Sequence, residues 1–405
     1  MQKIVKGVPV YTIAKILLLV LALLLTTYKL GISQGSHLLF NIVSFVVIIS
    51  VIVFIHEFGH YIVAKWAGVK IDIFSIGFGR EVFGWNDRSG TRWRIASLPL
   101  GGYVKMYGDA SEASTPLESI AELSDEEKLK TFYYKPLYKK AAIVVAGPVS
   151  NFILTIAILT VFIFTRGIPS SEPIIGEVMK DTPAQEAGLL SGDRVLSVNG
   201  EDVSSFQDIP RMIMTNLGTP VTLHLQRGSQ DISMSITPKQ VTEKDNLGNN
   251  YTHPLIGIKS TDIKLDKDVG ILRAVGEATR ATYRMCTTTL YGIGQMVTGE
   301  RSAREISGPL GIAKLSGQAV DKGLFMVFWF MATLSANLGL INLFPVPMLD
   351  GGHLLFYAIE AVQGKPPGKR FQEYGFRIGM ALIAMLMMFA ILNDARNLLS
   401  SFITK

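Results

Sequence analysis

Residues 46–60 read VVIISVIVFIHEFGH, and this stretch sets the class of protein that the chain encodes. On a helix, residues i and i+4 lie on one face, so the imidazoles of His56 and His60 can converge on one metal ion. Glu57 then lies beside that ion, where its carboxylate can take a proton from water. Ionisable groups inside an apolar helix are costly and usually functional. The pattern predicts a metal site within a membrane helix, rather than polar side chains that merely reach the interface from a helix end.

This segment is one of four or five apolar stretches that are long enough to approach a membrane span, which takes about 20 helical residues. The composition agrees, because 48% of the 405 residues are hydrophobic and only 18% are charged, below the usual share in soluble domains. The first stretch has Lys3 and Lys6 before a short apolar core, as a signal peptide does, but no clean cleavage site follows it. We therefore expect a retained helix there. The stretches cover residues 10–28, 38–64, 141–164, 324–344 and 379–392.

The lysines and arginines between these stretches predict an orientation. Cytoplasmic loops of membrane proteins carry an excess of basic residues, and here they gather in residues 3–15, 65–70, 135–140 and 365–370. We expect the N-terminus and the regions 65–140 and 353–375 in the cytoplasm, and region 166–322 on the periplasmic side of a bacterial inner membrane. The net charge of +6 therefore reflects basic loops and does not indicate nucleic-acid binding. Cys286 is the only cysteine, which excludes an intrachain disulfide.

A third metal ligand is needed, because catalytic zinc sites usually have three protein ligands and a water. The best candidate is in residues 342–352, NLFPVPMLDGG, where Asp350 follows an apolar helix that two prolines interrupt. Broken backbone at membrane depth is tolerated only where it lines a cavity or is buried in protein. A carboxylate at that depth needs a partner, and a metal ion is the most suitable one. We interpret Asp350 as a metal ligand rather than an ordinary helix-end residue.

These motifs resemble the site-2 protease family of intramembrane zinc metalloproteases. The resemblance rests on HEFGH, NLFPVPMLDGG, residues 146–152 (AGPVSNF), residues 77–80 (GFGR), residues 100–106 (LGGYVKM) and residues 307–309 (SGP), and it covers about residues 38–400. It is closest to the bacterial branch that regulates sigma-E. The resemblance implies a polytopic α-helical membrane protein with a membrane-associated β-hairpin region and an inserted extracytoplasmic PDZ (α+β) domain.

The resemblance also implies roles for individual residues. His56, His60 and Asp350 bind one Zn²⁺ per chain, and Glu57 activates water. Substrate contacts are expected from the NxxPxP and GFGR motifs, which here supply Asn342, Pro345, Pro347, Gly77 and Gly79. The implied substrates are single-span membrane proteins that another protease has first trimmed, such as anti-sigma factors or remnant signal peptides. Membrane lipid is the other implied partner, and nucleic acid is not expected.

The chain departs from the branch that it resembles in two ways. The branch carries two tandem PDZ modules, whereas one is found here. The family core has four membrane helices, whereas this chain has an extra hydrophobic segment at its start. Both departures concern substrate gating, and neither touches the expected metal ligands.

Residues 77–106 contain alternating and aromatic stretches around the turn-like sequence NDRSG at 86–90. They predict a β-hairpin of about Glu81–Trp85 and Arg92–Leu98, followed by a bend at Gly101-Gly102. A sheet edge near the metal would help, because strand addition holds a substrate segment in an extended form in which its peptide bonds are accessible. The alternative is an ordinary cytoplasmic hairpin whose tryptophans, Trp85 and Trp93, anchor at the interface.

Residues 174–200 predict a strand, a short helix, a glycine turn, a second strand and an Asn-Gly turn, and later strands follow at 221–226 and 232–236. This order resembles a PDZ domain of about residues 170–240, a fold that takes extended peptides by strand addition. It would either test the trimmed end of a substrate or act as a folded spacer that excludes large ectodomains. Residues 270–300 predict an amphipathic helix that lies on the outer membrane surface or packs on the PDZ domain.

The expected parts run in the following order along the chain. They are a hydrophobic segment (1–30), the HExxH helix (31–67), the hairpin region (68–139), a membrane helix (140–166), the PDZ domain (170–240), a linker with the amphipathic helix (241–323), the LDG-motif helix (324–352), and a cytoplasmic loop with the last helix (353–405).

Three other functions compete with a membrane protease. A PDZ scaffold with an inactive metal site would have no use for Glu57. A metal transporter would need further ionisable groups along a membrane path, and stretches 141–164 and 379–392 contain almost none. A secreted zinc protease with membrane tails would not embed its motif in an apolar helix. Zinc-dependent cleavage of membrane-embedded proteins is the function that the sequence favours.

Overall fold

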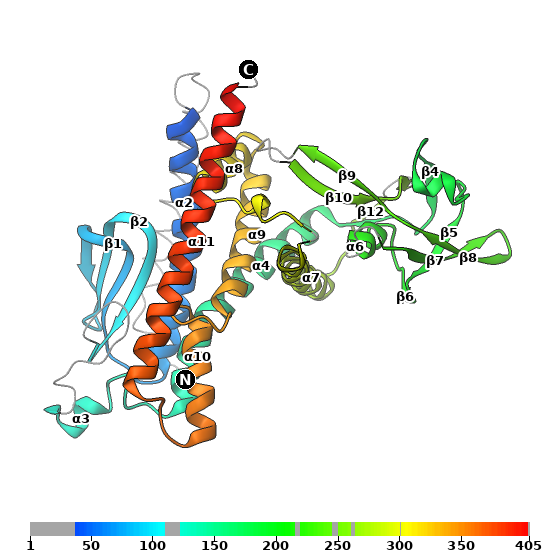
Figure 1. Cartoon of the computed structure of the whole chain (residues 1–405). Helices are drawn as coiled ribbons and strands as arrows, with labels where there is room; N and C mark the ends of the chain where they lie inside the picture. The colour runs from blue at the N-terminus through cyan, green and yellow to red at the C-terminus, as the bar shows by residue number, and fades with distance from the viewer. Residues whose placement is uncertain are drawn as a thin grey trace. The chain divides into compact units, whose positions relative to one another are not determined.

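The computed structural model describes residues 37–109, 122–214, 219–244, 250–260, 264–299 and 301–403. The expected first hydrophobic segment, at 10–28, lies outside these ranges. The chain divides into two compact units. The first runs to Ile158 and resumes at Ser307–Arg396, and the second comprises Leu159–Ile306 with residues 397–405. We call them the helical unit and the strand-rich unit (Figure 1).

Four helices in the described part of the chain are long and apolar enough to cross a membrane. The candidate spans are Leu39–Trp66, Leu137–Arg166, Leu324–Asn342 and Arg370–Arg396, which lie at four of the five apolar stretches in the sequence. The helices that contain them are α2 (His37–Trp66), α4 (Leu137–Arg166), α9 (Leu324–Asn342) and α11 (Lys369–Ile403). Three shorter helices join them: α3 (Asp125–Lys128), α8 (Pro309–Asp321) and α10 (Asp350–Gln363).

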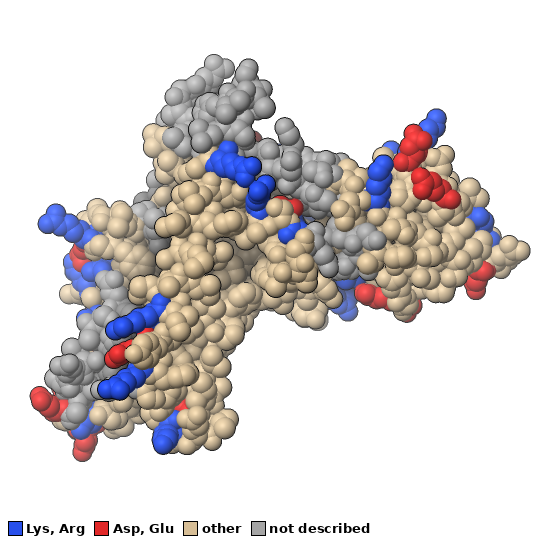
Figure 2. All heavy atoms as spheres, in the orientation of Figure 1, with Lys and Arg blue, Asp and Glu red and all other residues tan. Residues whose placement is uncertain are grey.

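Helix α11 presents an apolar surface to its surroundings. Between Arg377 and Asp394 its sequence contains no charged residue, and Figure 2 shows no lysine, arginine, aspartate or glutamate over the middle of this helix. Large side chains along it, such as Ile378, Met385 and Leu392, are exposed. A soluble protein with an exposed apolar face of this length would aggregate. This face of α11 is therefore suited to contact with the hydrocarbon core of a membrane.

Residues 309–321 form a helix within the stretch that the sequence predicts as a linker. Helix α8 packs on α2, and the two helices share a core with α9 that includes Ile48, Ile52, Val320 and Val327. Gly317 permits the close approach, since a Cβ there would overlap Asn41 of α2. The sequence did not reveal this contact because a 13-residue helix is too short to register as a span.

Asp394 of α11 fastens that helix to the start of α8. Its buried carboxylate accepts hydrogen bonds from the N–H groups of Gly308, Leu310 and Gly311, each at 3.0 Å. These are N–H groups that no intrahelical partner satisfies at a helix start, and an anion is favoured there. A Cβ at Gly308 would lie 2.6 Å from Asp394 Oδ2, which explains the glycine of the SGP motif.

We expect the substitution Asp394→Ala to destabilise the protein by about 3 kcal/mol, because hydrogen bonds to a charged group contribute roughly 1.5–3 kcal/mol and their loss leaves buried donors unpaired. Asp394→Asn, which keeps one acceptor oxygen, should cost less. Thermal unfolding of the purified protein in detergent measures both, with the exposed Asp125→Ala as control. Wild-type unfolding temperatures in Asp394→Ala would contradict this assignment.

Strands β1 (Ile71–Asn86) and β2 (Arg92–Met106) form an antiparallel pair that lies beside α2 (Figure 1). The turn brings Trp85 opposite Trp93, while residues 73–76 face residues 102–105. The same 73–76 segment also faces residues 92–95, so it is the interior of the sheet. Phe74, Trp93 and Tyr61 of α2 pack in one core between sheet and helix. No strand of the described chain pairs with the other edge of residues 102–106.

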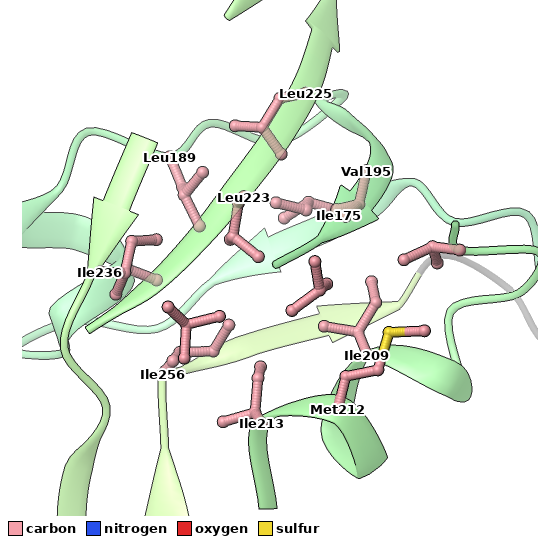
Figure 3. Packing of buried hydrophobic residues seen from close by; sticks show 14 of the residues in the cluster. Ile175, Leu189, Val195, Ile209, Met212, Ile213, Leu223, Leu225, Ile236 and Ile256 are labelled. Atoms are coloured by element: carbon pink, nitrogen blue, oxygen red, sulfur yellow. The ribbon is translucent and has the colours of Figure 1, made fainter. Parts of the chain in front are cut away.

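The strand-rich unit has a separate hydrophobic core. A four-stranded sheet with the order β6-β5-β7-β8 is formed by β5 (Arg194–Val198), β6 (Glu201–Asp202), β7 (Val221–Arg227) and β8 (Gln230–Ile236). The short helices α5 (Pro183–Glu186) and α6 (Asp208–Met214) accompany it. Figure 3 shows the core, in which Val195, Leu223 and Leu225 of the sheet lie in one cluster with Ile209, Met212 and Ile213 of α6.

This unit extends beyond the expected boundary at residue 240. Strand β11 (Ile258–Ser260) pairs with β4 (Ile175–Val178), and β12 (Lys264–Asp266) pairs with β3 (Ile168–Ser170). Strands β9 (Lys239–Lys244) and β10 (Asn250–Leu255), which precede β11 in the sequence, form a hairpin. Ile256, the residue after β10, belongs to the hydrophobic core. These strands are short and polar, so their long-range pairing leaves no periodic signal in the sequence. Helix α7 (Ile271–Thr298) follows at the position predicted for an amphipathic helix.

Candidate metal centre

Helix α2 and the start of α10 bring three potential ligands together. His56 Nε2 lies 3.3 Å from His60 Nε2 and 3.2 Å from Asp350 Oδ2, and His60 Nε2 lies 3.6 Å from Asp350 Oδ1. One ligand atom from each residue lies within 4.8 Å of the others. Two histidines and a carboxylate form a donor set that suits a catalytic zinc, with a fourth position left for water.

The hydrogen bonds of His60 favour a metal between these atoms. His60 Nδ1 lies 2.8 Å from the carbonyl oxygen of Ile143 on α4, and only a protonated nitrogen can donate to a carbonyl. In a neutral imidazole that tautomer leaves a lone pair on Nε2, the nitrogen that faces Asp350. A carbonyl or carboxylate that holds the other nitrogen is the usual support of a metal-binding histidine.

His56 is oriented by a second residue of α4. Its Nδ1 lies 3.1 Å from the side-chain amide of Asn151, whose Oδ1 is buried without a hydrogen-bond partner among the described residues. The orientation of an asparagine amide is assigned from the hydrogen bonds that its nitrogen and oxygen can make. If the oxygen faces the ring, it accepts the Nδ1 proton and leaves the lone pair of Nε2 toward Asp350. Both histidines then direct lone pairs to one point.

Asp350 supplies the negative charge at that point. Its Oδ2 is buried and has no hydrogen-bond partner among the described residues, although His56 Nε2 lies 3.2 Å from it and His60 Nε2 lies 3.6 Å from Oδ1. Lone pairs on three atoms at these separations repel one another unless a proton or a cation lies between them. The residues therefore fit a zinc ion on chemical grounds.

Gly147 of α4 keeps space open beside the histidines. A Cβ at this position would lie 2.3 Å from His60 Nε2 and 2.8 Å from His56 Cε1. The backbone of Gly147, which belongs to the AGPVSNF motif, therefore lies against the ring atoms that would bind the metal.

The loop before α10 places Asp350 at the first position of that helix. Met348 has a φ of 90°, a left-handed conformation that is rare and costly for a residue with a side chain. Gly351 and Gly352 allow the loop to fold over the helix start, because a Cβ at either would lie within 2.4 Å of a loop carbonyl oxygen. Pro347 in turn packs against α11 at Gly379, where a Cβ would overlap its carbonyl.

Asn342 and Glu57 complete the immediate surroundings. The side-chain nitrogen of Asn342, the last residue of α9, lies 3.5 Å from His56 Nε2. Helix α9 is fixed to α4 at this level, since Ser335 Oγ donates to the carbonyl of Asn151 at 2.9 Å. Glu57 lies on α2 next to His56 and faces Gly102 of the sheet. The structure thus brings Asn342 and Glu57 to the candidate site.

The other residues expected to contact substrate lie elsewhere. Gly77 and Gly79 have φ values of 90° and 87° and bend β1 near Leu98, where a Cβ at Gly77 would be 2.6 Å from the Leu98 carbonyl oxygen. Pro345 is exposed in the loop, and Pro347 packs on α11.

Comparisons with known proteins agree with this chemistry. The model of peptidase family M50 matches residues 44–386. A Rhizobium meliloti protein named "Putative zinc metalloprotease R01501" is 42% identical over 366 residues, which are 89% of this chain and 97% of the relative. Metalloprotease MmpA of Caulobacter vibrioides is 35% identical over 380 residues, 88% of this chain and 95% of the relative. A solved PDZ domain of an SdrC-like protein from Listeria monocytogenes covers 23% of this chain and 90% of its own, at 22% identity and a TM-score of 0.19.

Proposed function

This chain belongs to peptidase family M50 and is a zinc-dependent metalloendopeptidase of the membrane, and we propose that it cleaves single-span membrane proteins within the bilayer. The observation that carries the proposal is the convergence of His56, His60 and Asp350 inside the unit that contains the membrane spans. A protease whose metal-binding histidines lie on a span can act on a bond at membrane depth.

The ligand set assigns roles to the residues of the site. Bound zinc supplies Lewis acidity, which polarises a carbonyl and lowers the pKa of water. His56, His60 and Asp350 hold the metal, and Ile143 and Asn151 orient the two imidazoles. Glu57 takes the proton from the attacking water and passes it to the leaving nitrogen. The side-chain nitrogen of Asn342 lies 3.5 Å from His56 Nε2, so it is suited to donate a hydrogen bond to a substrate carbonyl held at the metal.

Water must reach this site, and the position of the two histidines on α2 indicates from which side of the membrane it enters. His56 lies ten residues before Trp66, the end of the helix, which corresponds to about 15 Å along a helix axis. The lysine-rich region that follows α2 is expected in the cytoplasm. We propose that water enters from the cytoplasmic side and that the enzyme is a multi-pass protein of the bacterial inner membrane.

The β1–β2 sheet provides a way to present the substrate. A peptide bond inside a substrate helix is shielded by its own hydrogen bonds, so the substrate must be extended locally before hydrolysis. The edge at residues 102–106 lies near Glu57, because a Cβ at Gly102 would be 3.0 Å from Glu57 Cγ. A substrate strand added at this edge would have its backbone groups satisfied within the membrane.

The strand-rich unit is proposed to be a periplasmic PDZ domain that limits which substrates reach the site. Its short helices and its small antiparallel sheets are consistent with that fold. A domain of this kind would admit substrates whose outer part has already been trimmed, such as anti-sigma factors or remnant signal peptides. It would do so by excluding large ectodomains or by binding the new terminus of the substrate.

Removal of the metal tests the proposed function. We expect the purified wild-type protein to hold about one zinc per chain, to lose cleavage of a single-span substrate after chelation, and to regain it with zinc. Asp350→Ala should hold at least about tenfold less zinc, whereas exposed Asp125→Ala should match wild type. Elemental analysis and a gel-based cleavage assay give both readouts. Chelation without effect on cleavage, or full zinc in Asp350→Ala, would contradict the ligand set.

A further inference from the structure

One row of residues on α2 faces the β1–β2 sheet. Val53, Glu57, Tyr61 and Lys65 are spaced by four and so lie on one side of the helix. A Cβ at Gly102 would lie 3.0 Å from both Val53 Cγ1 and Glu57 Cγ, so the sheet edge touches the first two. Tyr61 and Lys65 make hydrogen bonds to the other end of the sheet, the turn between β1 and β2. The proposed general base is thus part of the row that attaches the sheet.

Asp87 in that turn receives the bond from Tyr61. Its Oδ1 stabilises its own turn by accepting from the N–H groups of Ser89 and Thr91, at 2.8 and 3.0 Å. Its Oδ2 instead joins separate elements, because it accepts from Tyr61 Oη at 3.0 Å and from Trp93 Nε1 at 3.1 Å. One carboxylate therefore links α2 to both ends of the hairpin turn.

The carboxylate of Asp87 is charged at neutral pH. Burial by itself would raise the pKa of Asp87, but hydrogen bonds from Ser89, Trp93 and Thr91 outweigh it and hold that pKa below its usual value. Hydrogen bonds to an ionised acceptor are roughly twice as strong as neutral ones. The link between turn and helix is therefore a strong one.

Tyr61 is a rigid partner for this bond. It is fully buried, and its ring packs against Phe58, Phe74 and Trp93 with centroid separations of 6.0, 5.7 and 5.2 Å. The ring therefore contributes to the core, while the hydroxyl makes the directional contact with the turn. Replacing only the hydroxyl would release the contact and leave the packing in place.

We propose that Tyr61 and Asp87 are positioning residues that fix the sheet along α2 and so determine which substrate peptide bond lies at Glu57. This proposal rests on the proposed protease function. Along a strand each residue advances about 3.3 Å, so a small slide of the sheet would bring a different bond to the metal. A misplacement of about 1 Å can cost about 10²-fold in rate.

The test compares the full-length wild type with Tyr61→Phe on one single-span helical substrate. We expect unchanged zinc content, a fall in kcat of about tenfold, little change in KM, and product masses that reveal cuts at neighbouring bonds. Asp87→Asn, which keeps the shape of the side chain, is the second variant and should show the same pattern. Tyr283→Phe, on an exposed tyrosine of α7, is the matched control and should behave as wild type.

Three results would count against these proposals. Wild-type kcat and a single wild-type cut in both zinc-loaded variants would overturn the proposal. Loss of zinc in both variants would also overturn it, because the pair would then support the metal site and not the register of the sheet. A wild-type protein that holds zinc but cuts no membrane-spanning substrate would instead refute the proposed function.

Discussion

Replacing Glu57 by glutamine is expected to reduce kcat by about 10²–10⁴-fold while zinc stays bound, since this is the range that a positioned general base contributes. Glutamine has the same shape as glutamate but cannot take the proton of the attacking water. His56, His60 and Asp350 remain in place, so the metal content should not change. The measurement is kcat and zinc content of the same purified preparation.

The exposed Glu126→Gln of α3 is the matched control for this substitution, because it removes the same charge away from the site. It should retain wild-type activity and zinc. If Glu57→Gln cleaves at a wild-type rate, Glu57 is not the base, and the contact between this residue and Gly102 has another purpose. If it loses its zinc, Glu57 supports the metal and the division of roles within the motif is wrong.

Gly147→Ala is the second substitution with a large expected effect, although it adds only one methyl group. That methyl would lie 2.3 Å from His60 Nε2, so the ring must move away from the position at which it faces Asp350. Movement of His60 would also break its bond to the Ile143 carbonyl. We expect zinc affinity to fall by about 10–100-fold, as it does when the support of a metal-binding histidine is lost.

Zinc titration of the metal-free protein measures this effect. Gly294→Ala is the matched control, because it is also a helical glycine and an added Cβ there meets no atom within 4 Å. The control should bind zinc as the wild type does. If Gly147→Ala binds zinc with wild-type affinity, the two imidazole rings do not lie against Gly147 when they bind the metal. The packing of α4 on α2 at the site would then differ from the one described here.

The sequence predicted the features that depend on local pattern. Apolar stretches located the four described spans, and the i, i+4 spacing of His56 and His60 indicated that both rings would face one point. Asp350 could be inferred because an acid beside broken backbone at membrane depth requires a partner. Each of these inferences needs only a few neighbouring residues and the known cost of placing a polar or charged group at membrane depth.

The hydrogen-bond partners that orient His56 and His60 could not be predicted in the same way. The partner of His60 is a backbone carbonyl, that of Ile143, and every residue has one, so no residue type marks it. Asn151 did carry a signal, as an amide within an apolar helix, but nothing in the sequence identified His56 as its partner. Such contacts join residues 83 and 95 positions apart and depend on how helices pack.

The boundaries of the strand-rich unit illustrate the same limit. Strands β7 and β8 alternate apolar and polar residues and were predicted within a residue or two. Strand β11 has three residues and is held by its pairing with β4, about 80 positions earlier. A strand of that length has no periodicity to detect, so the strands that extend the unit beyond residue 240 were not predicted.

The proposed function places the bond cut by this enzyme inside a membrane span. The most direct test is to reconstitute the wild type in vesicles with a single-span substrate and to identify the cleaved bond by mass spectrometry of both products. We expect a cut within the apolar segment that is absent with Glu57→Gln. Cuts confined to the polar flanks of the span, or the same cut made by Glu57→Gln, would contradict it.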